Sequence, residues 1–322
     1  MRQLGVCLIT DTNELRELLT ALLPGLAISA VPASSGQRVV YFAYFDPETS
    51  RAAGIDDEVI QTRISWGEIV VKVSSGIAAS QITYLQREIE ILGKLKSRYF
   101  PALHYHNVYS HHPNTEEPIN RIFLTIEEKI DGEPLSNLMA HYASPLRATD
   151  FLIDLITSGD LLWSHKPSIV HRDLKPANIL IRTDGGICII DLGIARIEGA
   201  DGVTNTHAIF GPCTPGYSSP EQARNDKLNI NYKSDFFSIG IIAYELLSGV
   251  NPFAPNKNTP ILDILTNVQT VVPTPLGTSI GTPTALSNLV DSLLMKEPYQ
   301  RPRSPAHLLL TLQEVRSSLN GD

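Results

Sequence analysis

The sequence predicts an α+β chain with two lobes, a small β-rich lobe followed by a larger helical one. Residues 26–130 contain several short stretches rich in β-branched and aromatic residues, which are typical of strands. After Gly132 the apolar residues recur at helical spacing instead. At 322 residues the chain is long enough for two lobes, and we place their joint near Glu128–Gly132. Clefts between lobes are common ligand sites.

The β-rich part is expected to hold one main helix. The predicted strands are Leu26–Ala30, Val39–Phe45, Ile69–Val73, Leu103–Tyr109 and Ile122–Ile126. From Ala79 to Leu95 apolar residues recur every three or four positions, which predicts the helix. The stretch Asp46–Gly67 is polar and long for a hairpin connection, so we expect a long loop that is functional or disordered.

The N-terminal residues predict a short strand at 4–9 and a helix at 13–23. Asp11 or Thr12 is the expected N-cap, and Pro24-Gly25 is the expected stop. The helical part carries five predicted helices: Pro145–Ser164, Tyr232–Ser248, Pro260–Val268, Ala285–Met295 and Ser304–Leu319. The stretch Glu198–Ser219 has little periodicity and is expected to be a loop.

Composition excludes several classes of function. The formal charge of −8 disfavours a nucleic-acid partner, because such binding needs a basic surface. Cysteines occur only at positions 7, 188 and 213, without paired spacing, which fits a reducing compartment. No stretch of the sequence reads as a signal peptide, membrane span or lipidation motif. We therefore expect a cytoplasmic protein with no membrane partner.

The strongest chemical signal is a polar loop between two apolar stretches. It reads Ile169-Val170-His171-Arg172-Asp173-Leu174-Lys175-Pro176-Ala177-Asn178-Ile179-Leu180, and Ile189-Ile190-Asp191-Leu192-Gly193 follows. Phosphoryl transfer depends on positioning and charge neutralisation. Asp173 can orient an attacking hydroxyl and accept its proton. Asp191 and the amide oxygen of Asn178 can hold Mg²⁺, a cation that prefers oxygen ligands. Lys175 can place positive charge beside the transferred group.

From about Ala27 to Arg303 the sequence resembles the eukaryotic-type protein kinase family, and we expect a bacterial member of it. The resemblance implies a two-lobed protein kinase fold and a protein serine/threonine kinase that uses ATP and Mg²⁺. It places a kinase N-lobe at 27–131 and a C-lobe at 132–322, leaving 1–26 as an extension of unknown role. Asp191-Leu192-Gly193 resembles the metal-binding triplet, with Leu where Phe is commoner.

Later landmarks of the resemblance follow in order. Ser219-Pro220-Glu221 resembles the end of the activation segment, and Arg301 the residue that usually pairs with that glutamate. His171-Arg172-Asp173 with Asn178 resembles the family's catalytic loop, and Asp235 is expected to bind the backbone of that loop. Lys175, two residues after Asp173, is the family's mark of serine/threonine enzymes, and Thr214 is expected to hydrogen-bond both residues.

The stretch Gly67-Glu68-Ile69-Val70-Val71-Lys72-Val73 resembles the family's strand that carries the ATP-binding lysine, which would be Lys72. Glu88 is its expected partner, because Glu88 shares a helix face with Leu85, Leu92 and Leu95. Residues 127–132 resemble the family's hinge between the lobes, and the resemblance implies that backbone groups of Glu128 and Ile130 hydrogen-bond the adenine edge. Glu127 falls where the family usually has an apolar residue or Thr, and a one-residue offset with Ile126 is the alternative explanation.

The phosphate-covering loop departs from the family pattern G-x-G-x-x-G-x-V. Residues 33–40 read Ala33-Ser34-Ser35-Gly36-Gln37-Arg38-Val39-Val40, with one glycine. A loop without those glycines approaches phosphates less closely. Ser34, Ser35, Gly36 and Gln37 remain candidates for nucleotide binding, together with Val40 and Val70, which would contact the base. Arg38 could contact a phosphate.

Two other classes of function stay open at this point. One is a pseudokinase that binds nucleotide as a scaffold, although Lys72, Asp173, Asn178 and Asp191 are all present. The other is a small-molecule phosphotransferase of the antibiotic- or choline-kinase kind, which lacks the activation-segment ending. Expected partners are proteins with Ser/Thr acceptors and proteins encoded in the same operon. The sequence names no substrate or activating signal.

Three further features carry weaker hypotheses. Thr204 or Thr206 is a candidate for autophosphorylation, since a phosphate there could pair with Arg172 and order the segment. The alternative is that both are plain loop residues. His104 and His106 would share a strand face, but a solvated hairpin is favoured over a metal site. Cys213 is better explained as a small unreactive residue than as a redox-sensitive thiol.

Overall fold

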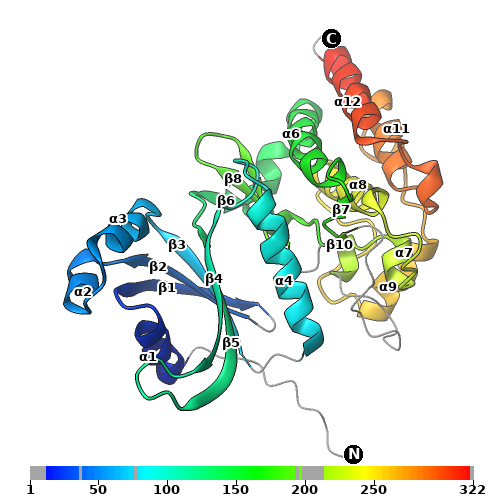
Figure 1. Ribbon diagram of the computed structural model, residues 1–322. Helices are drawn as coiled ribbons and strands as arrows, with labels where there is room; N and C mark the ends of the chain where they lie inside the picture. The colour runs from blue at the N-terminus through cyan, green and yellow to red at the C-terminus, as the bar shows by residue number, and fades with distance from the viewer. Residues whose placement is uncertain (1–11, 36–37, 76–78, 193–195, 198–213, 320–322) are drawn as a thin grey trace, which may run out of the picture. The chain divides into compact units, whose positions relative to one another are not determined.

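The computed structural model describes residues 12–35, 38–75, 79–192, 196–197 and 214–319. The chain divides into two compact units, Met1–Ile130 and Asp131–Asp322 (Figure 1). The first is built on an antiparallel sheet and the second mainly on helices, which confirms the predicted α+β, two-lobed class. Within the described residues, no helix combines the length and apolar character needed to cross a bilayer.

The N-terminal unit is organised by a five-stranded sheet with strand order β1-β2-β3-β5-β4. All neighbouring strands are antiparallel. The strands are β1 (Leu26–Ser35), β2 (Arg38–Phe45), β3 (Ile69–Ser75), β4 (Leu103–His111) and β5 (Pro118–Glu128). Each contains a predicted strand, and β1 and β5 extend well beyond the predicted ends. β1 and β2 form a hairpin in which Ser35 pairs with Arg38.

Pairing register separates the side chains of this sheet into two faces. On one face Tyr41 lies opposite Val71, which lies opposite Ile126. These residues are fully buried and belong to one hydrophobic cluster. Because side chains alternate along a strand, the neighbouring residues occupy the other face. Lys72 therefore projects from the face opposite this cluster, beside its cross-strand partner Thr125.

Helix α1 (Asn13–Leu22) covers the apolar face of the sheet. Its N-cap is Thr12, whose hydroxyl accepts a hydrogen bond from the Leu15 N–H at 3.1 Å. Leu15, Leu19 and Leu22 pack into the same cluster as the strands. The predicted helix is confirmed, and it is part of the core of this unit. The strand expected at 4–9 lies outside the described residues.

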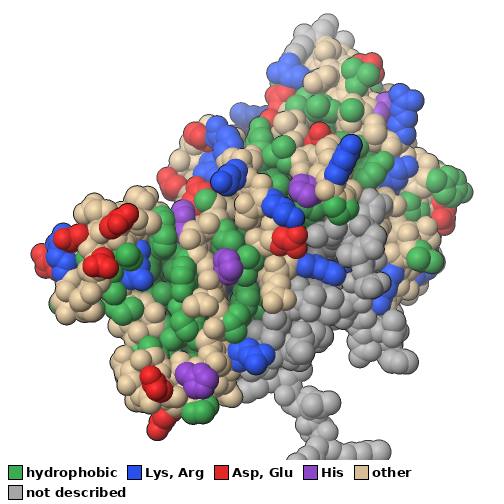
Figure 2. Space-filling view, viewed as in Figure 1, with side chains coloured by type: hydrophobic (Ala, Val, Ile, Leu, Met, Phe, Trp, Pro, Cys, Tyr) green, Lys and Arg blue, Asp and Glu red, His purple; other side chains and the backbone are tan. Residues whose placement is uncertain are grey.

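The prediction of a loop at Asp46–Gly67 is wrong, because this stretch forms two short helices, α2 (Pro47–Ala52) and α3 (Asp57–Ser65). Asp46 caps α2 by accepting the Thr49 N–H at 2.7 Å. Ile60 is the buried anchor of α3, and Arg63 donates to the Pro24 carbonyl at 2.9 Å. Charged side chains of both signs cover the outer surface of these helices (Figure 2).

Helix α4 (Ala79–Lys94) matches the predicted main helix of this unit. Leu85, Ile91 and Leu92 are buried, as is Glu88. Glu90, by contrast, is exposed and pairs with Lys94 at 2.6 Å. The helix therefore presents one carboxylate to the interior of the unit and another to solvent, as its periodicity predicts.

The C-terminal unit is built around helix α8 (Tyr232–Ser248), most of whose residues are buried. It ends at Gly249, which adopts a left-handed conformation with φ 76°. Helices α6 (Pro145–Trp163) and α12 (Pro305–Leu319) lie side by side (Figure 1). The remaining helices are α5 (Leu135–Leu138), α7 (Pro220–Ala223), α9 (Ile261–Thr270), α10 (Leu276–Ser279) and α11 (Thr284–Leu293). All five predicted helices of this part are confirmed, with small shifts at their ends.

Short strands frame the polar loop of this unit. They are β6 (Gly132–Pro134), β7 (Ile169–Val170), β8 (Ile179–Arg182), β9 (Ile187–Ile189) and β10 (Arg196–Ile197). β7 precedes the loop and β8 follows it, so both ends of residues 171–178 are tied to strands. Of the expected loop Glu198–Ser219, the structure describes residues 214–219, which include a 3₁₀ turn at Pro215–Tyr217. Thr204, Thr206 and Cys213 lie outside the described residues.

Candidate active site

Lys72 projects from the middle of β3 and lies close to two carboxylates. Its Nζ is 2.7 Å from Oε2 of Glu127 and 3.7 Å from Oε1 of Glu88. The Lys72 side chain is 15% exposed, and the two glutamates are buried. A buried charge needs an opposite charge beside it, and Lys72 has two. The expected partner Glu88 is within ion-pair distance, but the shorter contact belongs to Glu127.

Glu127 therefore belongs, with Lys72 and Glu88, to a charged cluster on this face of the sheet. Its strand register places it opposite Val70, on the Lys72 face, whereas Ile126 points into the apolar cluster. The alternative of an offset between these two residues is thus excluded. Thr125 also contributes, because its hydroxyl donates to Oε1 of Glu127 at 3.1 Å.

Arg38 provides the second positive charge of the cluster. Its guanidinium donates to Oε2 of Glu88 at 2.5 Å, and the Arg38 side chain is 16% exposed. That Arg38 contacts a phosphate stays a prediction; in this structure its side chain binds the carboxylate of Glu88. Sequence reasoning missed this pairing. The only available signal was the spacing of Arg38 and Lys72 on adjacent strands.

The remaining nucleotide-binding candidates of this unit fall on or beside the same sheet. Val40 lies opposite Lys72, and Val70 lies opposite Glu127, so both valines share the Lys72 face. Ser34 and Ser35 end β1, whereas Gly36 and Gln37 lie outside the described residues. The Glu128 N–H donates to the Ala102 carbonyl at 2.8 Å, and Ile130 is buried.

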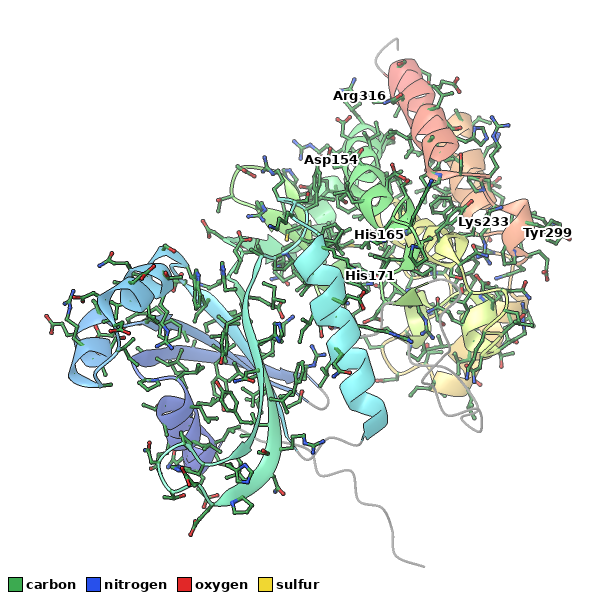
Figure 3. All side chains as sticks on the ribbon, viewed as in Figure 1. Asp154, His165, His171, Lys233, Tyr299 and Arg316 are labelled. Atoms are coloured by element: carbon green, nitrogen blue, oxygen red, sulfur yellow. The ribbon has the colours of Figure 1, made fainter. Side chains whose placement is uncertain are left out.

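The polar loop of the C-terminal unit is anchored by Asp235 of α8. Its carboxylate accepts hydrogen bonds from the backbone N–H groups of His171 and Arg172, each at 2.8 Å, and from Trp163 Nε1 at 2.8 Å. Complete burial raises the pKa of Asp235, although the neighbouring His171 and these hydrogen bonds oppose the shift. The expected tie to the loop backbone is confirmed. His171 is marked in Figure 3.

The backbone of this loop is held in an uncommon conformation. Arg172 has φ 72°, in the left-handed region that side chains rarely adopt. The Arg172 carbonyl accepts a hydrogen bond from the buried amide of Gln222 at 2.7 Å, in addition to the bond that Asp235 makes with its N–H. Such conformations persist where surrounding contacts fix them, and they are frequent at active sites. Sequence reasoning missed Gln222 and Trp163 as supports of the loop.

Asp173 stands at the centre of a set of hydrogen-bond donors. Its carboxylate accepts from Lys175 Nζ at 2.6 Å and from the Thr214 hydroxyl at 2.6 Å. Lys175 also donates to the Thr214 hydroxyl oxygen at 2.7 Å, and Asn178 Nδ2 donates to Asp173 Oδ2 at 3.1 Å. Both hydrogen bonds expected of Thr214 are present. The Asp173 side chain is 12% exposed, so its carboxylate is held in a fixed, partly buried position.

Asp191 follows β9 and is tied to the same loop through the backbone. The Ile190 N–H donates to the Asn178 carbonyl at 2.9 Å. Asp191 has φ 65°, a second left-handed residue beside the loop. Since Asn178 uses its amide nitrogen to bind Asp173, its side-chain oxygen is the atom that can bind a cation. A carboxylate and an amide oxygen fit the preference of Mg²⁺ for oxygen ligands.

The segment that follows Thr214 is anchored at Glu221 by a fully buried ion pair. Arg301 binds Glu221 with two hydrogen bonds of 2.7 and 2.9 Å, and both side chains are 0% exposed. Burial acts to raise the pKa of Glu221, but the hydrogen bonds and charge of Arg301 outweigh it and lower the pKa. The Ser234 hydroxyl donates to the same carboxylate at 2.6 Å. The expected pairing of Glu221 with Arg301 is confirmed.

Among the histidines of β4, His104 packs against an aromatic side chain. His104 stacks on Trp66, with ring centroids 5.1 Å apart. Burial lowers the pKa of His104, although the charge of Glu128 opposes the shift. Within the described residues there is no group of three or more His, Cys, Asp or Glu side chains arranged to hold a metal ion.

The comparisons with known proteins agree with this geometry. The protein kinase domain matches residues 66–311, well over half of the chain, so the chain belongs to the protein kinase family. It is 32% identical over 207 residues to the serine/threonine-protein kinase PknB of Mycobacterium tuberculosis, which covers 63% of this chain and 32% of PknB. It is 30% identical over 237 residues to PknL of the same species, which covers 72% of this chain and 55% of PknL.

These relatives are longer proteins. The chain spans about a third of the length of the first curated relatives that it matches, 29% of one from Clostridium perfringens and 32% of PknB. The family match begins at residue 66, so α1, β1, β2 and the two short helices precede it. The kinase resemblance of the sequence is thereby confirmed, and the relatives named here are bacterial.

Proposed function

We propose that this chain is a protein serine/threonine kinase that transfers the γ-phosphoryl group of ATP to Ser or Thr hydroxyls of proteins. The observation that carries the proposal is the hydrogen-bonded set of Asp173, Lys175 and Thr214. A carboxylate held by a lysine and a hydroxyl can orient an acceptor hydroxyl and take its proton, with positive charge close by. The kinase names of the relatives support the same reaction class.

In this proposal each site residue has a distinct role. Asp173 orients the acceptor hydroxyl and receives its proton, and Lys175 stabilises negative charge beside it. Asn178 and Asp191 hold Mg²⁺, which when bound neutralises phosphate charge. Lys72 binds nucleotide phosphate with Glu88 as an ion-pair partner, while Val40 and Val70 contact the base. The remaining nucleotide-binding candidates keep their expected roles: Ser34, Ser35, Gly36 and Gln37 near the phosphates, and the backbone of Glu128 and Ile130 at the adenine.

We also propose the finer features of this function. The protein acts in a reducing compartment, the cytoplasm, which is consistent with three cysteines that have no paired spacing. Residues 27–131 act as the kinase N-lobe and 132–322 as the C-lobe. Autophosphorylation occurs at Thr204 or Thr206, and Arg172 binds the phosphate.

The test is a phosphotransfer assay of the purified chain with ATP and Mg²⁺, read by mass spectrometry of the chain and of a mixed protein acceptor. We expect phosphate on Ser and Thr only, including on the chain itself. Thermal unfolding with ATP, with and without Mg²⁺, is measured in parallel, because a bound ligand raises the melting temperature. A shift without any transfer would favour the nucleotide-binding scaffold, and the lack of both would contradict the proposal.

A further inference from the structure

Four charged residues on the Lys72 face of the N-terminal sheet form one continuous cluster. Arg38 contacts Glu88 at 2.5 Å, Glu88 lies 3.7 Å from Lys72, and Lys72 contacts Glu127 at 2.7 Å. The residues come from β2, α4, β3 and β5, so no two are neighbours in sequence. Two positive and two negative charges make the cluster formally neutral.

Glu127 is firmly held within this cluster. It is 2% exposed, and both of its carboxylate oxygens accept hydrogen bonds, one from Lys72 and one from Thr125. Loss of the Lys72 contact would leave a buried carboxylate without a neutralising charge, which is strongly unfavourable. Glu127 therefore has to keep its contact with the ammonium of Lys72 whatever else that group binds.

Glu88 is held differently. Arg38 occupies its Oε2, whereas its Oε1 is buried, has no hydrogen-bond partner and faces Lys72 from 3.7 Å. An ammonium group carries three donors, so Lys72 can serve Glu127, Glu88 and a further acceptor in turn or together. Glu127 competes with other anions for the Lys72 ammonium. Arg38 binds Glu88 and neutralises its charge, so Glu88 attracts Lys72 less strongly.

We propose that Glu127 and Arg38 are an opposed pair of positioning residues that set how strongly Lys72 attracts the phosphates of the nucleotide. Glu127 weakens that attraction, because its charge offsets the ammonium. Arg38 strengthens it, because it neutralises Glu88 and adds positive charge. The inference rests on the proposed function, in that the anion bound by Lys72 is a nucleotide phosphate.

The sign of each effect follows from the charge that remains. Without Glu127 the cluster carries one net positive charge, and without Arg38 it carries one net negative charge. A unit charge about 4 to 8 Å from a phosphate charge changes affinity about two- to sixfold at the dielectric of bulk water, and by more at the lower effective dielectric of a partly buried site. We take about three- to tenfold as the expected range. Salt screens such an effect. A purely structural role for either residue would give neither opposite signs nor this dependence on salt.

The experiment measures the dissociation constant of Mg·ATP by calorimetry for the wild type, Glu127→Gln, Arg38→Gln and the double variant. We expect Glu127→Gln to bind about three- to tenfold more tightly and Arg38→Gln to bind weaker by a similar factor. The double variant should return to within about twofold of the wild type. The spread among the variants should narrow as the salt concentration rises from about 50 to about 500 mM. Turnover gives a second readout, in which KM for ATP moves more than kcat.

Glu90→Gln is the matched control, because Glu90 lies on the same helix as Glu88 but is 51% exposed and paired with Lys94. It should leave the affinity unchanged. Glu127→Met also removes the charge, so it serves if the glutamine variant does not fold, and we expect the same sign of change. Melting temperatures without nucleotide report folding for every variant.

Weaker binding in both Glu127 variants would overturn the inference, as would shifts of the same sign in the Glu127 and Arg38 variants or shifts that salt does not alter. Because calorimetry needs no turnover, failures of the inference and of the proposed function are separate. A wild type that binds Mg·ATP but transfers no phosphate contradicts the proposed function alone. A wild type that binds no nucleotide contradicts both.

Discussion

The two units of the molecule hold their buried charges in different ways. In the C-terminal unit, Glu221 and Arg301 form a two-point ion pair with no exposed surface, and Arg301 also donates to the carbonyls of Met295, Lys233 and Lys296. In the N-terminal unit, Lys72 lies between two carboxylates, and one oxygen of Glu88 accepts no hydrogen bond.

Under the proposed function, this difference separates a buried ion pair that stabilises the fold from a charged cluster that binds a nucleotide phosphate. The Glu221–Arg301 pair has its hydrogen bonds satisfied from several directions, so a new partner could only displace an existing one. The Lys72 cluster has no net charge, Lys72 is partly exposed, and one oxygen of Glu88 accepts no hydrogen bond. An added anion can therefore bind Lys72 without displacing an existing hydrogen bond. Asp173 lies between the Glu221–Arg301 pair and the Lys72 cluster in how firmly it is held. Several donors hydrogen-bond its carboxylate, while its side chain stays 12% exposed.

The largest effect is expected where the proposed chemistry takes place. Asp173→Asn should lower kcat about 10³-fold, because the amide cannot accept the proton of the acceptor hydroxyl. Mg·ATP affinity should change little, since Asp173 is not one of the proposed metal ligands. Steady-state kinetics and calorimetry on the same preparation check both statements. Turnover at the wild-type rate would show that Asp173 is not the catalytic base.

The closed pair of the C-terminal unit gives the next largest effect. Arg301→Met should lower the free energy of unfolding by about 3 kcal/mol or more, because Glu221 would remain buried without a charge partner. Arg316→Met is the matched control (Figure 3). Arg316 and Asp150 form an ion pair that is 41% and 45% exposed, so its loss should cost less than about 1 kcal/mol. Urea unfolding measures both, and equal losses would remove the contrast.

The open cluster should tolerate the loss of one carboxylate far better. We expect Glu127→Gln to lower the free energy of unfolding by about 1 kcal/mol, whereas Glu221→Gln should cost about 3 kcal/mol. The reason is that Lys72 has Glu88 as a second carboxylate, only 3.7 Å away. Chemical denaturation of the two variants side by side measures the difference. If Glu127→Gln proved the more damaging, the Lys72 cluster would be as rigid as the Glu221 pair.

Much of the fold could be predicted because its signals are local. The period of apolar residues located α4 and α8, and stretches of β-branched residues located β2 and β3. The two helices between β2 and β3 were missed because they span only six and nine residues and expose most of their surface. Ile60 alone anchors α3, so no periodic pattern forms.

The site divides along the same line. Asp173, Lys175 and Asn178 lie within six residues, so their spacing carries the information. The partners of Lys72 are 16 and 55 positions away along the chain, and choosing between them requires the register of β3 against β5. A residue such as Glu127, at an apolar position of the family pattern, looks like an alignment error until the register shows which face it occupies.

The smallest effect concerns acid, and it differs in sign between two buried carboxylates of the C-terminal unit. Burial acts to raise the pKa of Glu221, but the hydrogen bonds and charge of Arg301 hold it below its ordinary value. This carboxylate therefore contributes stability above its unfolded pKa and loses that contribution as the pH falls through the folded pKa. Burial raises the pKa of Asp235, and that group acts in the opposite direction.

A single acid-unfolding curve mixes the contributions of Glu221 and Asp235. The difference in free energy of unfolding between the wild type and Glu221→Gln isolates Glu221. We expect this difference to be constant from about pH 7 to about pH 5 and to shrink on further acidification. Urea titrations across this range measure it, with Glu90→Gln as the exposed control. A difference that grew in acid would mean that the charge of Arg301 does not dominate the environment of Glu221.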